Sequence, residues 1–152
     1  MKTLLVFHSR SGTTRRVARE LASRLKADVE EIVPLQPHAE SRLGYAQCAL
    51  ESMAALTPAI VPPTRDPRRY ERVVVGTPVW FWSLSSPVRT WLMQQREALT
   101  RARLGLFCTM GGSGASIAFE RMETLAGRES AARLALTAEQ VQHGSAHEIN
   151  GF

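Results

Sequence analysis

The feature that most constrains the fold of this chain is a regular alternation of short apolar runs with helical patterns. Residues 3–8 are almost entirely apolar, which is typical of a strand buried between two layers of helices. A polar, glycine-containing segment follows at 9–14. Val17, Leu21 and Leu25 then recur every four residues, as they would along the buried side of a helix. A buried strand, a polar turn and an amphipathic helix open a βαβ unit.

The same alternation continues to the end of the chain. Prolines at 58, 62, 63 and 67 mark an extended connector in its middle. Further strands are expected at 28–33, 72–76, 104–109 and 133–137, and further helices at 40–56, 87–99 and from Gly114 to about 125. We therefore predict an α/β fold: one domain over residues 1–152, with a five-stranded parallel sheet covered by helices on both faces.

Cysteine usage and the start of the chain bear on its surroundings. Cys48 and Cys108 are far apart and form no CxxC motif, so we expect no disulfide framework, no metal site and a reducing compartment. The opening apolar run is too short for a secretion signal and has no small-residue cleavage site after it. No stretch approaches the roughly 20 apolar residues of a membrane span. We expect a cytoplasmic protein without a membrane span.

The formal net charge of +5 raises the question of nucleic-acid binding. The arginines are spread over every segment, however, with no dense block and no basic stripe interleaved with aromatic residues. We therefore expect no nucleic-acid partner.

Three segments that follow strands have unusual compositions, and ligands of open α/β sheets bind at such strand ends. Residues 9–14 place hydroxyl groups and a glycine at the start of a helix, where free amide groups bind anions. Residues 77–82 hold two of the three tryptophans, which could wall a planar ring. Residues 109–114 hold three glycines, which allow close backbone approach. The candidate cofactor-binding residues are Ser9, Arg10, Ser11, Gly12, Thr13, Thr14, Thr77, Pro78, Val79, Trp80, Phe81, Trp82, Thr109, Met110, Gly111, Gly112, Ser113 and Gly114.

Together these segments favour a phosphorylated planar cofactor over other ligands. The first segment is not a GxxxxGK[ST] motif, so ATP or GTP hydrolysis is not expected. No GxGxxG follows the first strand, so a nicotinamide Rossmann site fits less well. Each segment alone has a simpler interpretation: a capped helix, tryptophans that pack on the following helix, or an ordinary glycine turn. Trp91, within the expected helix at 87–99, is assigned to the core.

The segments Ser9-Arg-Ser-Gly-Thr-Thr14, Gly76-Thr-Pro-Val-Trp-Phe-Trp82 and Cys108-Thr-Met-Gly-Gly-Ser-Gly114 resemble the three FMN loops of the flavodoxin-like flavoproteins. The resemblance covers residues 3 to about 137. It implies a three-layer sandwich with strand order 2-1-3-4-5 and FMN as cofactor.

Two features depart from that family's usual pattern. About fifteen residues follow Thr137, so the final helix is expected to be short or missing, and a homodimer could cover the sheet left bare. The chain is also basic, whereas electron-carrying flavodoxins are typically acidic. This favours a reductase.

The expected function is an FMN-dependent oxidoreductase that takes electrons from NAD(P)H and passes them to a quinone or a similar small acceptor. No catalytic acid or base is assigned. His8 is interpreted as a hydrogen-bonded structural residue and Cys108 as a core residue. The alternatives are an electron carrier for a redox partner protein and a flavin-free binding module on the same fold.

Overall fold

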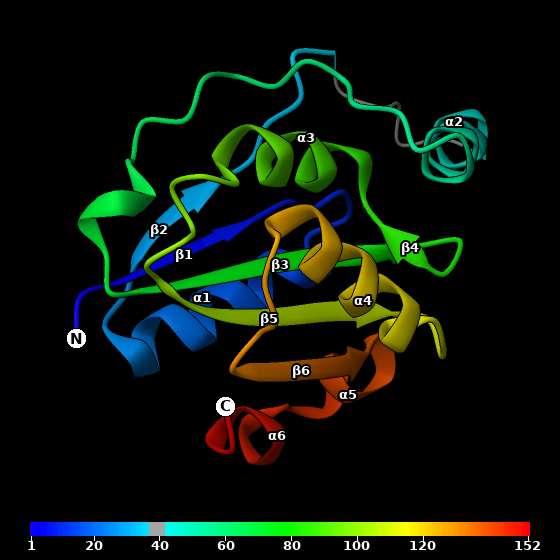
Figure 1. Ribbon diagram of the computed structural model, residues 1–152. Helices are drawn as coiled ribbons and strands as arrows, with labels where there is room; N and C mark the ends of the chain where they lie inside the picture. The colour runs from blue at the N-terminus through cyan, green and yellow to red at the C-terminus, as the bar shows by residue number, and fades with distance from the viewer. Residues whose placement is uncertain (37–41) are drawn as a thin grey trace.

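The expected strands form one parallel sheet in the computed structural model, which describes residues 1–36 and 42–152 (Figure 1). The sheet runs in the order β2-β1-β3-β5-β6, which is the predicted order of the five parallel strands. A sixth, two-residue strand, β4, pairs antiparallel with the end of β3 and was not predicted. The strands are β1 (Thr3–Phe7), β2 (Asp28–Glu31), β3 (Arg72–Trp80), β4 (Ser83–Leu84), β5 (Arg103–Met110) and β6 (Ala132–Thr137).

Helices cover both faces of this sheet, so the predicted three-layer sandwich is confirmed (Figure 1). One face packs against α3 and α4, and the other against α1, α5 and α6. A 3-10 turn, η1, precedes β3. The helical elements are α1 (Thr13–Leu25), α2 (Arg42–Met53), η1 (Pro67–Arg69), α3 (Ser86–Gln95), α4 (Ala115–Ala126), α5 (Ala138–His143) and α6 (Ala146–Asn150).

The alternation of side chains along β1 explains why this strand carries no polar face. Leu4 and Val6 point into the core under α3 and α4, while Leu5 and Phe7 point into the core under α1. All four are fully or almost fully buried, and each contributes roughly 1.5–3 kcal/mol through removal of apolar surface from water. Strand β1, which lies between β2 and β3, is thus fixed by burial on both sides.

Helix α2 differs from the expectation for residues 40–56. It begins at Arg42, residues 40 and 41 lie outside the described part of the chain, and it ends at Met53. Leu43 and Leu50 recur at helical spacing along this segment, but both are exposed, Leu43 at 79% and Leu50 at 67%. The helix projects beyond one end of the sheet (Figure 1). The extended chain that follows it pairs at Ile60 with Pro34, just after the edge strand β2.

The final helix was expected to be short or missing; the chain ends instead in two short helices, α5 and α6. Val141 of α5 and Ile149 of α6 are nevertheless buried in the core with α1, and Phe152 packs against it. The carbonyl oxygen of Phe152 accepts a hydrogen bond of 3.1 Å from the Arg72 guanidinium. These side chains cover the flank that the sequence led us to expect to be bare.

Among residues 1–36 and 42–152, none of the helices has both the length and the apolar character needed to cross a membrane.

Candidate functional site

The three predicted loops meet at the carboxyl ends of β1, β3 and β5, where two cavities adjoin. The first, here called the loop cavity, has a volume of ≈ 190 Å³, and the second, the aromatic cavity, has ≈ 220 Å³. Tyr45, Val79 and Gly111 line both. The loop cavity is also lined by Arg10, Ser11, Thr13, Thr14, Pro78, Trp80, Thr109, Met110 and Ala138, and the aromatic cavity by Phe81, Trp82, Gly112 and Ser113.

The first loop ends at the start of α1, where the N-cap residue is a glycine without a side chain to cap the helix. Gly12 precedes α1 with φ of 101°, a left-handed backbone that favours glycine, and no acidic residue lies in the first turn. The amide groups of a first helical turn have no partner within the helix, and the helix dipole makes this end positive. The start of α1 can therefore hold an anion.

Side chains of the first loop divide into two groups. Ser9 is buried, and its Oγ accepts hydrogen bonds from the amides of Gly12 and Arg15 at 3.1 and 3.2 Å, so it shapes the loop. Ser11 and Thr13 line the loop cavity. Thr14 also lines it, and its Oγ1 lies 2.7 Å from Oγ1 of Thr109, which ties the first loop to the third.

Two arginines of this region have different surroundings. Arg15 forms an ion pair with Glu31, and the hydrogen bond to that carboxylate is the main reason that the pKa of Arg15 is raised. Arg10 lines the loop cavity and can add positive charge there. It also lies near Cys48 of α2: burial raises the pKa of that thiol, and Arg10 opposes the rise.

The second predicted loop, Thr77 to Trp82, is in fact strand plus a tight turn. Strand β3 continues through Thr77 and Pro78, which pair with β5, to Trp80. Phe81 and Trp82 form the two-residue connection to β4, with φ of 47° and 55°. Two-residue hairpin turns adopt this left-handed backbone because it matches the strand twist, but non-glycine residues are uncommon there. The sequence lacks the Asn-Gly or Asp-Gly signal that would have predicted the turn.

The aromatic side chains of this hairpin take different positions. Trp80 is buried, and its ring meets that of His8 edge-on at 5.7 Å. Nδ1 of His8 lies 3.0 Å from the carbonyl oxygen of Ile32, which agrees with the structural role predicted for this histidine. Phe81 and Trp82 are exposed at the rim of the aromatic cavity. Thr77 is buried, and its Oγ1 accepts a hydrogen bond from the Ser85 amide at 2.9 Å.

The third loop packs directly on this hairpin. Nε1 of Trp82 donates a hydrogen bond of 3.2 Å to Oγ of Ser113. Gly114 has φ of +100° and faces Trp82, leaving no room for a side chain. Gly111 and Gly112 have open space where a Cβ would stand, so their backbone is accessible from the cavities.

Fourteen of the eighteen predicted residues thus line one cavity or both, while the other four, Ser9, Gly12, Thr77 and Gly114, shape the backbone around them. Sequence reasoning missed Tyr45 and Ala138. Tyr45 comes from α2, and its ring centre lies 6.4 Å from that of Phe81. No local pattern marks Tyr45, because only the placement of α2 beyond the sheet brings it to the cavities.

Cysteine and metal chemistry find no support in the described residues. Cys108 is fully buried, and burial raises the pKa of its thiol to about 12, so it stays protonated near neutral pH. No group of three or more His, Cys, Asp or Glu side chains in residues 1–36 and 42–152 is arranged to hold a metal ion.

The fold is shared with known flavoproteins. A flavoprotein from Lactobacillus acidophilus NCFM, solved in complex with FMN, is 23% identical over 95% of this chain and 98% of its own, with a TM-score of 0.77. A protein assigned as a flavoprotein from Bacteroides eggerthii DSM 20697 is 22% identical over 93% and 94%, with a TM-score of 0.79. A flavodoxin, WrbA-like protein from Agrobacterium tumefaciens is 13% identical over 99% and 96%, with a TM-score of 0.60.

No curated protein matches this sequence. The model of the flavodoxin family matches residues 2–134, which is most of the chain. The chain therefore belongs to the flavodoxin family.

Proposed function

We propose that this protein binds FMN in the two adjoining cavities and uses it to pass electrons from NAD(P)H to a quinone or a similar small acceptor. The observation that carries this proposal is the arrangement of one anion-binding helix start and one aromatic-walled cavity side by side at the same sheet edge. A phosphorylated planar cofactor requires a phosphate site and a ring site close enough for one cofactor molecule to occupy both.

The residues at the start of α1 fit the phosphate group. Ser11 and Thr13 offer hydroxyl donors, and the amides of Thr13 and Thr14 at the start of α1 are further donors, whereas the Arg15 amide donates to Ser9. Arg10 supplies positive charge, and none of the described residues that line this cavity carries a carboxylate.

The residues around Val79 fit the ring system. Trp80 provides a buried aromatic wall, while Tyr45 and Trp82 stand at the open side. The backbone of Gly111 and Gly112 can approach polar ring atoms closely because no side chain intervenes. A structural neighbour with the same fold, the flavoprotein of Lactobacillus acidophilus, is solved in complex with FMN, which supports the assignment.

Bound FMN would supply the redox chemistry, and the chain would bind, orient and shield it. Within residues 1–36 and 42–152, no Asp, Glu, His, Lys or Cys side chain lines either cavity, and we assign no catalytic acid or base. Phe81 and Trp82 at the rim are exposed, so a second planar molecule such as a nicotinamide or a quinone could approach the outer side of the bound ring there. The net charge of +5 favours the approach of anionic NAD(P)H.

A second candidate function is electron transfer to a protein partner. It is favoured by the exposed aromatic and apolar side chains at the rim, namely Tyr45, Phe81 and Trp82, with Leu50 and Met53 exposed on α2. Such side chains are suited to contact with another protein. Under this alternative NAD(P)H alone would not reduce the bound flavin at a useful rate.

The test is anaerobic reduction of the FMN-loaded protein by NADH or NADPH, followed by addition of a benzoquinone. The proposal predicts bleaching of the flavin band by one of the two nucleotides and rapid return of the band with quinone. We expect Trp82→Ala to slow both steps, because it opens the aromatic cavity, and Met93→Ala, an exposed position on α3 outside both cavities, to leave them unchanged. Flavin that binds but is reduced by neither nucleotide would contradict the reductase and favour the carrier.

A further inference from the structure

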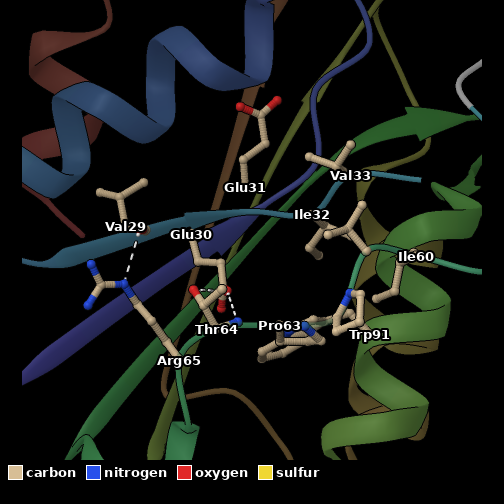
Figure 2. Close-up of a pocket in the computed structure, with 12 residues that line it drawn as sticks. Val29, Glu30, Glu31, Ile32, Val33, Ile60, Pro63, Thr64, Arg65 and Trp91 are labelled. Carbon is tan, nitrogen blue, oxygen red and sulfur yellow. Dashed lines mark hydrogen bonds between the residues drawn. The ribbon is translucent and has the colours of Figure 1, made fainter. Parts of the chain in front are cut away.

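A separate cavity of ≈ 300 Å³ lies between the edge strand β2, the extended segment after α2, and helix α3 (Figure 2). It is lined by residues 29–33, residues 60–65 and Trp91. None of these residues lines the loop cavity or the aromatic cavity. The proposed flavin chemistry leaves this cavity without a role.

The prolines of the extended segment explain why the cavity exists. The amide of Val61 donates a hydrogen bond of 2.8 Å to the carbonyl oxygen of Val33, so the segment begins as an added strand at the sheet edge. Pro62 and Pro63 have no amide hydrogen and cannot continue this pairing. Contact resumes at Thr64, whose amide and hydroxyl donate to Oε1 of Glu30 at 2.5 and 2.9 Å.

Two polar groups that line this cavity have no hydrogen-bond partner within residues 1–36 and 42–152. The Trp91 side chain is only 1% exposed, and its Nε1 is buried without a hydrogen bond among the described residues. The second carboxylate oxygen of Glu30, Oε2, is also buried and unpaired there. Buried donors and acceptors in native proteins are nearly always hydrogen-bonded. An unpaired donor from α3 and an unpaired acceptor from β2 thus line the same cavity, and a ligand that carries the complementary pair could satisfy both.

Figure 2 shows how the side chains are arranged around this space. Glu30 and Ile32 point from β2 toward the extended segment, and Trp91 lies beside Ile60 and Pro63. Glu31 points the opposite way, toward α1, where it pairs with Arg15. Thr64 and Arg65 also line this space; the Thr64 hydroxyl donates to Glu30 and the Arg65 guanidinium pairs with Asp28, while Ile32, Ile60 and Pro63 supply apolar surface.

We propose that this cavity binds a small aromatic carboxamide. Its carbonyl oxygen would accept a hydrogen bond from Nε1–H of Trp91, and its N–H would donate to Oε2 of Glu30. Its ring would pack on Ile32, Ile60 and Pro63. The volume is at the lower end of small-molecule sites, which suits a single ring, and the Glu30 carboxylate disfavours anions. This site is independent of FMN.

The experiment follows the indole Nε1–H resonance of Trp91 by nitrogen-15 NMR in the full-length protein, with and without added FMN. The resonance is identified by its loss in Trp91→Phe and by its proximity to the methyl groups of Ile60. Three probes are titrated: benzamide, N,N-dimethylbenzamide, which has no N–H, and benzoate, which is anionic. We expect a saturable shift with benzamide, binding about tenfold or more weaker with N,N-dimethylbenzamide, and weaker still with benzoate.

Matched variants separate the carboxylate from its surroundings. Glu30→Gln keeps an oxygen for Thr64 but presents an N–H to the cavity, so the preference for benzamide over N,N-dimethylbenzamide should disappear. Glu31→Gln, on the other side of β2, should keep the preference for benzamide. Added FMN should not change this preference in the wild-type protein. The proposal is overturned if the Trp91 resonance shows no saturable shift with benzamide, or if the wild-type protein binds all three probes equally.

Discussion

Gly114 lies so close to Trp82 that a Cβ built on the glycine would stand 2.9 Å from the tryptophan Cα. It would also stand 2.9 Å from Cγ1 of Val79. The glycine loop after β5 and the hairpin turn after β3 are therefore packed backbone to backbone. Because Trp82 has a left-handed backbone as well, each segment holds the other in an uncommon conformation.

Gly114→Ala is expected to displace the Phe81–Trp82 turn and weaken FMN binding by about tenfold or more. A loss of about 1.4 kcal/mol in binding free energy is enough for a tenfold weaker dissociation constant. The matched control is Gly144→Ala. Gly144 has a similar φ of +96° but nothing within 4 Å of a Cβ. Both variants should lose roughly 1–2 kcal/mol of stability through backbone strain, but only Gly114→Ala should alter flavin affinity in a fluorescence titration. Equal flavin affinity in the two variants would contradict the coupling.

Gly76 meets the ring of Phe107 within the sheet. A Cβ at position 76 would fall 2.0 Å from Cζ of Phe107, so Gly76→Ala must displace a fully buried aromatic side chain. We expect a loss of about 1–3 kcal/mol or more in the free energy of unfolding, measured by urea denaturation. Gly112→Ala, where a Cβ meets nothing within 4 Å, should change stability by less than about 0.5 kcal/mol.

The two thiols should be unreactive in the folded protein. Cys48 and Cys108 are buried, and burial raises the pKa of both, that of Cys108 from 9.0 to about 12. At pH 8 we expect a disulfide reagent such as Ellman's reagent to label them only after denaturation. The variant Cys48→Ala isolates Cys108 for this measurement, and fast labelling of that folded variant would contradict its assignment to the core.

The raised pKa of the Cys108 thiol also makes the free energy of unfolding fall at alkaline pH. The unfolded chain ionises Cys108 near pH 9, whereas the folded chain keeps it protonated until about pH 12. The stabilising contribution is therefore complete below pH 9 and is lost as the pH rises toward 12. Denaturation of Cys108→Ala should show a shallower decline over this range than the wild-type protein.

Glu123 of α4 should contribute pH-dependent stability at the opposite end of the scale. Burial alone would raise its pKa, but hydrogen bonds from Arg133 and Ser130 outweigh burial and lower it below 4.5. The contribution is present above the unfolded pKa and is lost as the pH falls through the folded pKa. Glu123→Gln should cost about 1–3 kcal/mol at pH 7, and its difference from wild type should shrink below pH 4. A constant difference would contradict this assignment.

The sequence was sufficient to predict the sheet because its strands are buried on both sides. Leu4 to Phe7 can be read as a strand from local composition alone, and Val17 and Leu21 mark α1 by their spacing. The glycine and hydroxyl segments could likewise be placed at strand ends without knowledge of tertiary contacts.

The features that sequence could not predict depend on contacts between distant segments. The apolar spacing of Leu43 and Leu50 is typical of a buried helix face, yet α2 projects past the sheet and leaves both exposed. Tyr45 reaches the cavities for the same reason. The turn at Phe81 and Trp82 is stabilised by the packing of Gly114 rather than by residues that favour a left-handed backbone.

The central claim is that the loop cavity and the aromatic cavity hold FMN through its phosphate and its ring. The most direct measurement is a titration of the purified protein with FMN and, in parallel, with riboflavin, which lacks the phosphate, followed by flavin fluorescence and by absorption after desalting. We predict a dissociation constant for FMN of about 1 µM or tighter, at least about tenfold tighter than that for riboflavin because charge-assisted hydrogen bonds to the phosphate are lost. Failure to bind FMN at micromolar protein concentrations would contradict the account, and equal affinity for the two flavins would contradict the assignment of the α1 start as the phosphate site.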